Sequence, residues 1–474
     1  MILNQHYLGC LSQASYLIAD ERTRSAAVVD PRRDVEVYLE EAERLGVTIR
    51  HVLLTHFHAD FVAGHLELAR RTGAALYLGK RARAEFEFNA VGDGDVIEFG
   101  DVRLTILETP GHTPEGISIV VHDLAADRDA PYGVLTGDTL FIGDVGRPDL
   151  MASVGVSAAE LAGMLYDSLH GKLARLPDAT RVYPGHGAGS LCGKALSNET
   201  VSTIGEQKRF NYALQPMDEA AFVALVTADQ PTAPRYFGYN ADLNRRRRDD
   251  LDERLERELA PLDLAAFLAA LRGGAQVIDA RSANEFAAGH LEGSVNLGLD
   301  GRFASWAGTV LDPRRETLIV AEAPAEREAA VRLGRVGFER VVGYLAGGPE
   351  ALEAAAERVR ESRRITAPEL AGELAGYRVV DVRTRGEFAS GHVEGALHVP
   401  LEELEARAAE LPADRPLALV CRSGYRSSLA SSLLERAGRP AAVDLIGGME
   451  AWKASGLPTV VEEAPACPST RVQA

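Results

Sequence analysis

Four clusters of histidine and aspartate offer side chains that can bind a metal ion. In chain order they are His56, His58 and Asp60 in one cluster, and then His112, Asp138 and His186 singly. The first cluster follows residues 50–55, whose apolar run predicts a buried strand, so its three alternate side chains can converge on one centre. Each later residue is flanked by glycine or other turn residues. Because imidazole nitrogen and carboxylate oxygen are common ligands of zinc and iron, the pattern predicts a metal centre.

A cysteine near the C-terminus has neighbours suited to sulfur chemistry. Residues 417–434 predict a strand, a tight loop and a helix, with Cys421, Arg422 and Arg426 in the loop. Helix N-terminal N–H groups and two cationic side chains favour a thiolate and stabilise an anionic persulfide. The loop is shorter than the C-x5-R loop with which cysteine phosphatases wrap a phosphate. We therefore expect sulfur transfer at Cys421, and its polar neighbours disfavour the alternative of a packed core thiol.

An internal repeat precedes this loop. Residues 277–293 match residues 379–395 almost position by position, as two copies of one small domain would. In the earlier copy the position of Cys421 holds Ala321, and Glu322 and Glu326 replace the arginines. An acidic loop without a nucleophile would repel a thiolate or thiosulfate. The middle copy is thus predicted to lack sulfur-transfer activity and to serve as a spacer, docking or regulatory domain.

The length and patterning of the chain predict about three α/β domains. A chain of 474 residues is too long for one hydrophobic core. The predicted domains are residues 1–244, 259–350 and 364–461, followed by a flexible tail over 462–474. In both C-terminal copies short buried strands alternate with helices, which favours parallel sheets. The charged segment 244–258 is expected to form a solvated connector helix rather than a basic binding patch, since acids alternate with its arginines.

The charge and cysteine content exclude several classes of function. With 51 Lys and Arg against 69 Asp and Glu, the net charge of -18 disfavours nucleic acid and anionic membranes as partners, while small anionic substrates need only a local positive pocket. No segment approaches the roughly 18 apolar residues of a membrane-spanning helix. The first 20 residues lack the features of a signal peptide. The four cysteines form no CxxC pair, so neither disulfides nor a structural zinc site is expected, and a reducing cytoplasm is the predicted location.

The histidine and aspartate clusters, in this order and with their flanking residues, resemble those of the metallo-β-lactamase superfamily. The resemblance covers residues 1–244 and implies an αββα sandwich that binds metals in loops at one edge. Dinuclear zinc hydrolases of this superfamily, such as glyoxalase II, have the motif H-x-H-x-D-H. This chain has Phe61 at the position of the last histidine. Since an apolar ring cannot coordinate a metal, a mononuclear centre is expected.

Two neighbouring sequence segments narrow the resemblance to one group within this superfamily. Residues 137–150 and 185–193 are similar to persulfide dioxygenases fused to rhodaneses. That resemblance implies one Fe(II) per chain, held by His56, His112 and Asp138. Two histidines and one carboxylate form the facial triad that suits Fe(II) and leaves positions open for substrate and O2.

The same resemblance implies supporting roles for four further residues around the iron, and the spacing along the chain adds Cys192 to them. His58, Asp60 and His186 would surround the metal or orient the substrate, although spacing alone does not separate these roles from ligation. Arg147 would receive a carboxylate of a thiol substrate such as glutathione, with a surface ion pair as the alternative. Cys192, six residues after His186, would accept or relay sulfur, or else be a buried structural thiol.

Residues 364–461 resemble a single-domain rhodanese, and the two resemblances together imply a coupled function. A low-molecular-weight thiol persulfide and O2 would give sulfite and thiol, and Cys421 would form or consume thiosulfate by sulfur transfer, in sulfide and persulfide detoxification. A homo-oligomer, dimer or tetramer, is expected. The alternatives are a glyoxalase-II-like dizinc thioester hydrolase, which Phe61 disfavours, and a non-enzymatic sulfur carrier or sensor.

Overall fold

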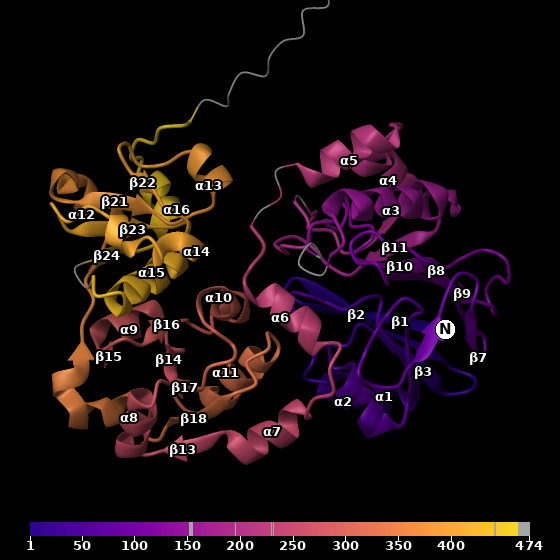
Figure 1. The fold of residues 1–474 in the computed structure, drawn as a ribbon, viewed down its shortest axis with the longest axis horizontal. Helices are drawn as coiled ribbons and strands as arrows, with labels where there is room; N and C mark the ends of the chain where they lie inside the picture. The colour runs from indigo at the N-terminus through magenta and orange to yellow at the C-terminus, as the bar shows by residue number, and fades with distance from the viewer. Residues whose placement is uncertain (151–154, 195, 229, 231, 440–441, 463–474) are drawn as a thin grey trace, which may run out of the picture. The chain divides into compact units, whose positions relative to one another are not determined.

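The computed structural model describes all residues except 151–154, 195, 229, 231, 440–441 and 463–474 (Figure 1). The chain forms two compact units. The first contains the described residues of 1–257 with the short segments 311–313 and 331–339. The second contains residues 258–310, 314–330 and the described residues from 340 onward.

The first unit contains two six-stranded sheets. The strands of one sheet, in spatial order, are β1 (Ile2–Leu8), β2 (Gln13–Asp20), β3 (Ser25–Val29), β4 (Thr48–Leu53), β5 (Ala75–Gly79) and β6 (Asn89–Val91). Those of the other are β12 (Ser202–Thr203), β11 (Arg181–Pro184), β10 (Gly133–Gly137), β9 (Ile117–Asp123), β8 (Val102–Glu108) and β7 (Val96–Phe99). The helices are α1 (Glu36–Leu45), α2 (His65–Thr72), α3 (Ala158–Gly171), α4 (Ile204–Phe210), α5 (Glu219–Thr227), α6 (Tyr236–Leu243) and α7 (Leu251–Glu258).

Apolar alternation along the strands builds the core between these two sheets. Tyr16 and Leu53 from one sheet pack with Leu104 and Ile119 from the other, and all four side chains are buried. On the outer face of the second sheet, α3 and α5 bury a second apolar cluster, while α1 and α2 contact β4 of the first sheet. The layers are therefore helix, sheet, sheet, helix, and the predicted αββα sandwich is confirmed.

The second unit contains two five-stranded parallel sheets. Their strands, in spatial order, are β13 (Ala260–Leu262), β18 (Val341–Leu345), β17 (Thr317–Val320), β14 (Gln276–Asp279) and β16 (Val295–Asn296), and then β20 (Arg364–Ile365), β24 (Ala442–Leu445), β23 (Leu417–Val420), β21 (Arg378–Asp381) and β22 (Leu397–His398). A small antiparallel ribbon pairs β15 (His290–Leu291) with β19 (Val359–Arg360). The helices are α8 (Leu264–Arg272), α9 (Ala283–Ala288), α10 (Phe303–Val310), α11 (Ala325–Gly334), α12 (Ala367–Gly372), α13 (Arg385–Ala389), α14 (Leu401–Leu404), α15 (Tyr425–Arg436) and α16 (Gly448–Ala454).

The two sheets of this unit have the same order of corresponding strands, which confirms the internal repeat. Strands β14 and β21 begin the matched sequence segments, and each lies between its neighbours β16 and β17, or β22 and β23. Parallel strands connected by helices are buried on both faces, which explains their short continuous apolar runs. The α/β fold class with parallel sheets in both copies is confirmed.

The charged segment after α6 differs from the expected solvated helix. Helix α7 begins only at Leu251, so the prediction of a helix from residue 244 is wrong for the first half of the segment. The reason is tertiary: the side chain of Arg248 is 2% exposed and forms an ion pair with the buried carboxylate of Glu67. Of the predicted tail, residues 463–474 lie outside the described part of the chain.

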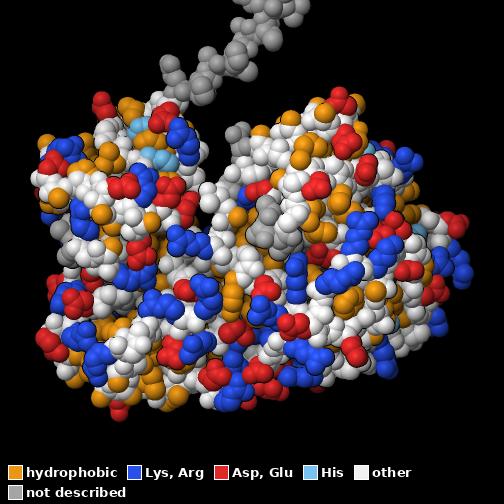
Figure 2. Space-filling model, in the orientation of Figure 1, with side chains coloured by type: hydrophobic (Ala, Val, Ile, Leu, Met, Phe, Trp, Pro, Cys, Tyr) orange, Lys and Arg blue, Asp and Glu red, His pale blue; other side chains and the backbone are white. Residues whose placement is uncertain are grey.

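The visible face of the molecule carries charged side chains of both signs (Figure 2). Figure 2 shows Lys and Arg side chains interspersed with Asp and Glu over the visible face, without one large basic patch. Among the described residues, no helix combines the length and the hydropathy needed to cross a membrane.

Candidate active sites

The six predicted metal-binding side chains lie in four loops at one edge of the sandwich. His56, His58 and Asp60 follow β4, His112 follows β8, Asp138 follows β10, and His186 follows β11. Strands β8, β9, β10 and β11 are neighbours in one sheet, and the N–H of Ile117 donates to Thr55 of the loop after β4. The fold therefore brings together residues that are up to 130 positions apart in the sequence.

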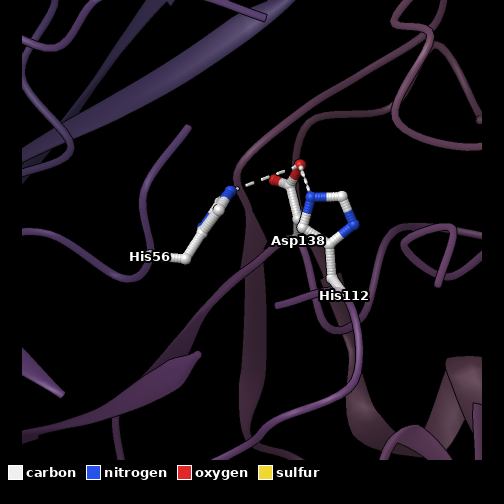
Figure 3. Close-up of side chains that lie close together, drawn as sticks. All are labelled: His56, His112 and Asp138. Atoms are coloured by element: carbon white, nitrogen blue, oxygen red, sulfur yellow. Dashed lines mark ion pairs between the residues drawn. The ribbon is translucent and has the colours of Figure 1, made fainter. Parts of the chain in front are cut away.

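His56, His112 and Asp138 form the first of two groups (Figure 3). The Oδ2 atom of Asp138 lies 3.8 Å from His56 Nε2 and 3.6 Å from His112 Nε2, and all three residues are buried. Two atoms that each lie about 2.1 Å from one metal ion are at most about 4.2 Å apart. Both distances satisfy that limit, so these three side chains are arranged to share one ion.

The unsatisfied atoms of this group fit a metal. His56 Nε2 and both carboxylate oxygens of Asp138 are buried and have no hydrogen-bond partner among the described residues. Such atoms cost free energy unless an ion or another polar group satisfies them. Burial, together with the charges of His58, His112 and His186, holds the pKa of His56 well below its usual value. The ring is therefore neutral at physiological pH and offers the lone pair that a ligand needs.

Hydrogen bonds orient the two histidine rings of the group. His56 Nδ1 lies 2.9 Å from Thr55 Oγ1, whose hydroxyl donates to Asp30, and His112 Nδ1 lies 2.9 Å from the backbone carbonyl of Arg147. Each contact engages Nδ1 and leaves Nε2 facing the centre. Thr55 and Asp30 were not singled out from the sequence, since their role depends on contacts between β3, β4 and the loop.

The second group consists of His58, Asp60 and His186. His186 Nε2 lies 3.5 Å from Asp60 Oδ2 and 3.5 Å from Asp138 Oδ1, so Asp138 stands between the two groups. Burial lowers the pKa of His58, but Asp30, whose Oδ1 lies 3.0 Å from His58 Nε2, outweighs this and raises it. A carboxylate thus competes with a metal for His58.

The apolar ring of Phe61 packs against the second group. Its side chain is 1% exposed, and its ring centroid lies 4.3 Å from that of His58. The aromatic ring offers no electron pair to a metal and fills the space beside His58. This packing agrees with the interpretation that the second group is short of one ligand.

The structure also places Arg147 and Cys192 at this centre. Arg147 is buried, and its Nε and Nη2 each donate to one oxygen of Asp149 at 2.7 Å. A substrate carboxylate would have to replace Asp149 at that fork. Cys192 is buried beside Asp138 and His186, and burial, Asp60 and Asp138 raise the pKa of its thiol well above the usual value.

Cys421 occupies the predicted loop between β23 and α15. Its side chain is buried, and the backbone N–H of Gly424 donates to Sγ at 3.1 Å. Arg426, the second residue of α15, donates two hydrogen bonds to Glu387, at 2.7 and 2.8 Å. Arg422 is instead exposed and pairs with Glu450 on the surface. The structure therefore brings Arg426, and not the guanidinium of Arg422, into a buried polar network at the loop.

Comparison with known proteins agrees with this geometry. Residues 8–186 match the metallo-beta-lactamase superfamily, and residues 263–355 and 366–455 each match the rhodanese-like domain. The mitochondrial persulfide dioxygenase ETHE1 of Bos taurus is 30% identical over 203 residues, which are 42% of this chain and 69% of the bovine protein. A crystal structure of a metallo-beta-lactamase from Staphylococcus aureus covers 73% of this chain and 98% of its own, with a TM-score of 0.64 and 31% identity. The chain belongs to the metallo-beta-lactamase superfamily and carries two rhodanese-like domains.

Other relatives of this chain are named for a different reaction from that of ETHE1. A hydroxyacylglutathione hydrolase from a Bradyrhizobium strain is 34% identical over 245 residues, which are 50% of this chain and 83% of the relative. The chain spans 54% of the length of further curated relatives that it matches. Similarity therefore establishes the family and suggests an enzyme that binds a metal, but it does not choose between oxidation and thioester hydrolysis.

The first rhodanese-like domain lacks the nucleophile at the corresponding place. Ala321 follows β17 as Cys421 follows β23, and the side chain of Ala321 is buried. The backbone alignment that the repeat predicted is thus correct. A methyl group at this position cannot accept a sulfur atom, so Ala321 cannot take the part of a rhodanese nucleophile.

The ion pair of Glu387 and Arg426 makes the stability of the second rhodanese-like domain depend on pH. Burial opposes ionisation of Glu387, but its hydrogen bonds from Arg426 outweigh this and lower its pKa to about 2. Because this pKa is lower in the folded than in the unfolded state, the stabilisation is complete above about pH 4.5 and is lost as the pH falls toward 2. A difference of this size corresponds to about 1–3 kcal/mol at neutral pH.

We therefore expect Glu387→Gln to destabilise the second unit at pH 7 and to flatten its loss of stability between pH 4.5 and 2.5. Urea unfolding followed by the fluorescence of the two tryptophans, Trp306 and Trp452, measures this unit. Glu450→Gln is the matched control, because the exposed pair with Arg422 contributes little. Equal effects of the two variants would contradict the assignment of Glu387.

Proposed function

We propose that this protein is an Fe(II)-dependent persulfide dioxygenase coupled to a rhodanese sulfurtransferase. The observation that carries the proposal is the buried triad of His56, His112 and Asp138 next to a second group in which Phe61 replaces a ligand. The proposed overall reaction is RSSH + O2 + H2O → RSH + SO3²⁻ + 2 H⁺. Bound Fe(II) would supply the redox chemistry that activation of O2 requires and that zinc lacks.

The chain's own residues prepare the site for such an ion. Thr55 and the carbonyl of Arg147 hold the two imidazole rings with Nε2 inward. Asp138 supplies a negative charge that would partly balance a divalent cation. A small cavity lined by His56, His112, Asp138 and several threonines adjoins these atoms, and the reacting sulfur of a persulfide would have to approach through it. Burial of all three ligands limits access of bulk water, which would compete for the open positions.

The second reaction belongs to Cys421. Its thiolate would attack the sulfane sulfur of thiosulfate, Cys–S⁻ + S–SO3²⁻ → Cys–S–S⁻ + SO3²⁻, with the S–S bond of thiosulfate broken and a new one formed. The Gly424 N–H, which now donates to Sγ, would stabilise the anionic sulfur. The reverse reaction would consume sulfite from the first site and make thiosulfate. Two sites on one chain raise the effective concentration of the shared product.

Two other functions follow from particular observations. A dizinc thioester hydrolase is favoured by the second group of His58, Asp60 and His186 and by the similarity to hydroxyacylglutathione hydrolase. A non-enzymatic sulfur carrier or sensor would need Cys421 alone. The thiol partner, the homo-oligomeric state and the cytoplasmic location stay predictions from the sequence.

Oxygen uptake separates these three functions. With glutathione persulfide the protein is expected to consume O2 and form sulfite, and with a glutathione thioester it is expected to show no hydrolysis above background. Anaerobically purified protein is expected to hold about one iron per chain. Phe61→His should raise the metal content toward two per chain, because it restores a ligand to the second group. Two tightly bound zinc ions in the wild type, with thioester cleavage and no oxygen uptake, would overturn the proposal.

A further inference from the structure

Helix α15, which follows Cys421, is anchored to the rhodanese-like domain that lacks a cysteine. Both belong to the second compact unit. Three hydrogen bonds connect the helix to the segment around β16: Tyr425 Oη donates to the carbonyl of Gly298 at 2.9 Å, Ser428 Oγ donates to Asn296 Oδ1 at 2.7 Å, and the N–H of Asn296 donates to Ser432 Oγ at 3.1 Å. The serine hydroxyls and Asn296 are buried, so these bonds form away from competing water.

Near the C-terminus of α15, the side chain of Glu435 contacts the same neighbouring domain. The carboxylate of Glu435 accepts from the N–H of Gly293 at 3.1 Å and lies 3.0 Å from His290 Nε2. His290 is buried, stacks on Phe286 with ring centroids 3.7 Å apart, and contacts the carbonyl of Phe286 through Nδ1. Helix α15 is therefore fixed to the neighbouring domain along its length and not at one point only.

The contact is tightest next to the sulfur-transfer loop. A Cβ atom added to Gly301 would lie 2.2 Å from Cε2 of Tyr425, so only glycine at this position lets the tyrosine ring lie where it does. Trp306 of the same domain lies against Arg426, with its ring centroid 6.0 Å from the guanidinium carbon. Two consecutive residues that start α15 thus meet side-chain or backbone atoms of the domain without a nucleophile.

These residues directly follow the amide that contacts the nucleophile. Gly424, whose N–H donates to Cys421 Sγ, precedes Tyr425 and adopts a left-handed conformation with φ of 97°. A Cβ on Gly424 would lie 2.9 Å from the backbone nitrogen of Gly447, so the loop has little room to shift on its other side. The direction of the Gly424 N–H therefore depends on where Tyr425 is held.

We propose that the rhodanese-like domain without a cysteine positions the sulfur-transfer loop of the rhodanese-like domain that contains Cys421. Tyr425 is the positioning residue, and it is held in place by its contacts with Gly298 and Gly301. The domain would keep the Gly424 N–H aimed at the sulfur of Cys421 while charge moves onto and off that atom. This inference rests on the proposed sulfurtransferase function, and it assigns a catalytic contribution to a domain that has no nucleophile.

The test replaces Gly301 with alanine in the full-length protein. The added methyl group should displace Tyr425 and lower kcat for thiosulfate-dependent sulfur transfer by about 10- to 100-fold, the range expected for misplacement of a reacting group by about 1 Å. The KM for thiosulfate should change less than about twofold, because no residue that attracts the anion is altered. Gly289→Ala is the matched control in the same domain, since its Cβ would meet only Val359 Cγ1, at 3.5 Å.

A second measurement, which does not depend on catalytic turnover, tests the environment of Cys421 directly. Alkylation of Cys421 by iodoacetamide, followed by peptide mass spectrometry, is measured against pH. In Gly301→Ala the pH of half-maximal alkylation should rise, because the thiolate loses the Gly424 N–H, whereas Gly289→Ala should match the wild type. A wild type without sulfur transfer would overturn the proposed function, while the alkylation profiles would still decide the positioning role.

Tyr425→Phe covers the case in which Gly301→Ala does not fold. It removes only the hydroxyl that donates to Gly298, and the expected loss in kcat is about fivefold, the value of one hydrogen bond. Tyr377→Phe removes a hydroxyl that accepts from Arg363 elsewhere in the same domain as Cys421 and should leave kcat unchanged. A folded Tyr425→Phe or Gly301→Ala protein with wild-type kcat and alkylation profile would overturn the inference.

Discussion

Cys421→Ser is expected to lower thiosulfate-dependent sulfur transfer by at least about 10³-fold, as loss of a nucleophile does in other enzymes. A serine hydroxyl stays protonated at neutral pH and cannot hold a sulfane sulfur. Oxygen uptake with glutathione persulfide should persist at nearly the wild-type rate, because the proposed iron ligands His56, His112 and Asp138 lie in loops of the first unit. The products should shift from thiosulfate toward free sulfite.

Cys467→Ser serves as the control for loss of a thiol and should leave both activities unchanged. Sulfite and thiosulfate are separated and quantified after the same amount of O2 has been consumed. If folded, iron-loaded Cys421→Ser protein loses oxygen uptake as well, the two sites are not independent. Cys421 would then take part in the oxidation itself.

His112→Ala should have the opposite effect, with loss of oxygen uptake and retention of sulfur transfer. Removing one of three ligands should lower iron content and reduce oxygen uptake by at least about 10³-fold, as for loss of an essential catalytic group. Sulfur transfer at Cys421 should stay within about twofold of the wild type, because thiosulfate needs no metal to react with a thiolate.

His122→Ala is the matched control, since His122 lies on β9 away from the two ligand groups. Iron is measured by plasma emission spectrometry, oxygen uptake with an electrode, and sulfur transfer with thiosulfate in the same preparation. Retention of both iron and oxygen uptake by His112→Ala would show that the triad is chosen wrongly. The second group of His58, Asp60 and His186 would then be the place to look for the metal.

Much of the site could be predicted because its chemistry is concentrated in short segments. His56, His58 and Asp60 follow one strand, and Cys421 stands between a strand and a helix, so strand periodicity and turn residues locate them. Ala321 was recognisable as a missing nucleophile because the two copies align almost residue by residue. The α/β class of the two C-terminal copies followed from the same local patterns, whereas the αββα sandwich followed from the resemblance to the metallo-β-lactamase superfamily.

Roles that depend on partners distant in the sequence could not be predicted in this way. Arg422 and Arg426 looked equivalent beside Cys421, but only Arg426 is drawn inward, because Glu387 on another helix receives it. Arg248 looked like part of a solvated helix and is buried on Glu67.

The amino-acid sequence alone was enough to name the donors, the nucleophile and the inactive copy, since each depends on residue type and on neighbours a few positions away. Only the folded chain decides which donors meet, that Asp138 stands between two groups, that Asp30 engages His58, and that Tyr425 rests on Gly301. The physical reason is that these relations are contacts across strands, loops and domains. Their geometry depends on packing, and spacing along the chain does not encode it locally.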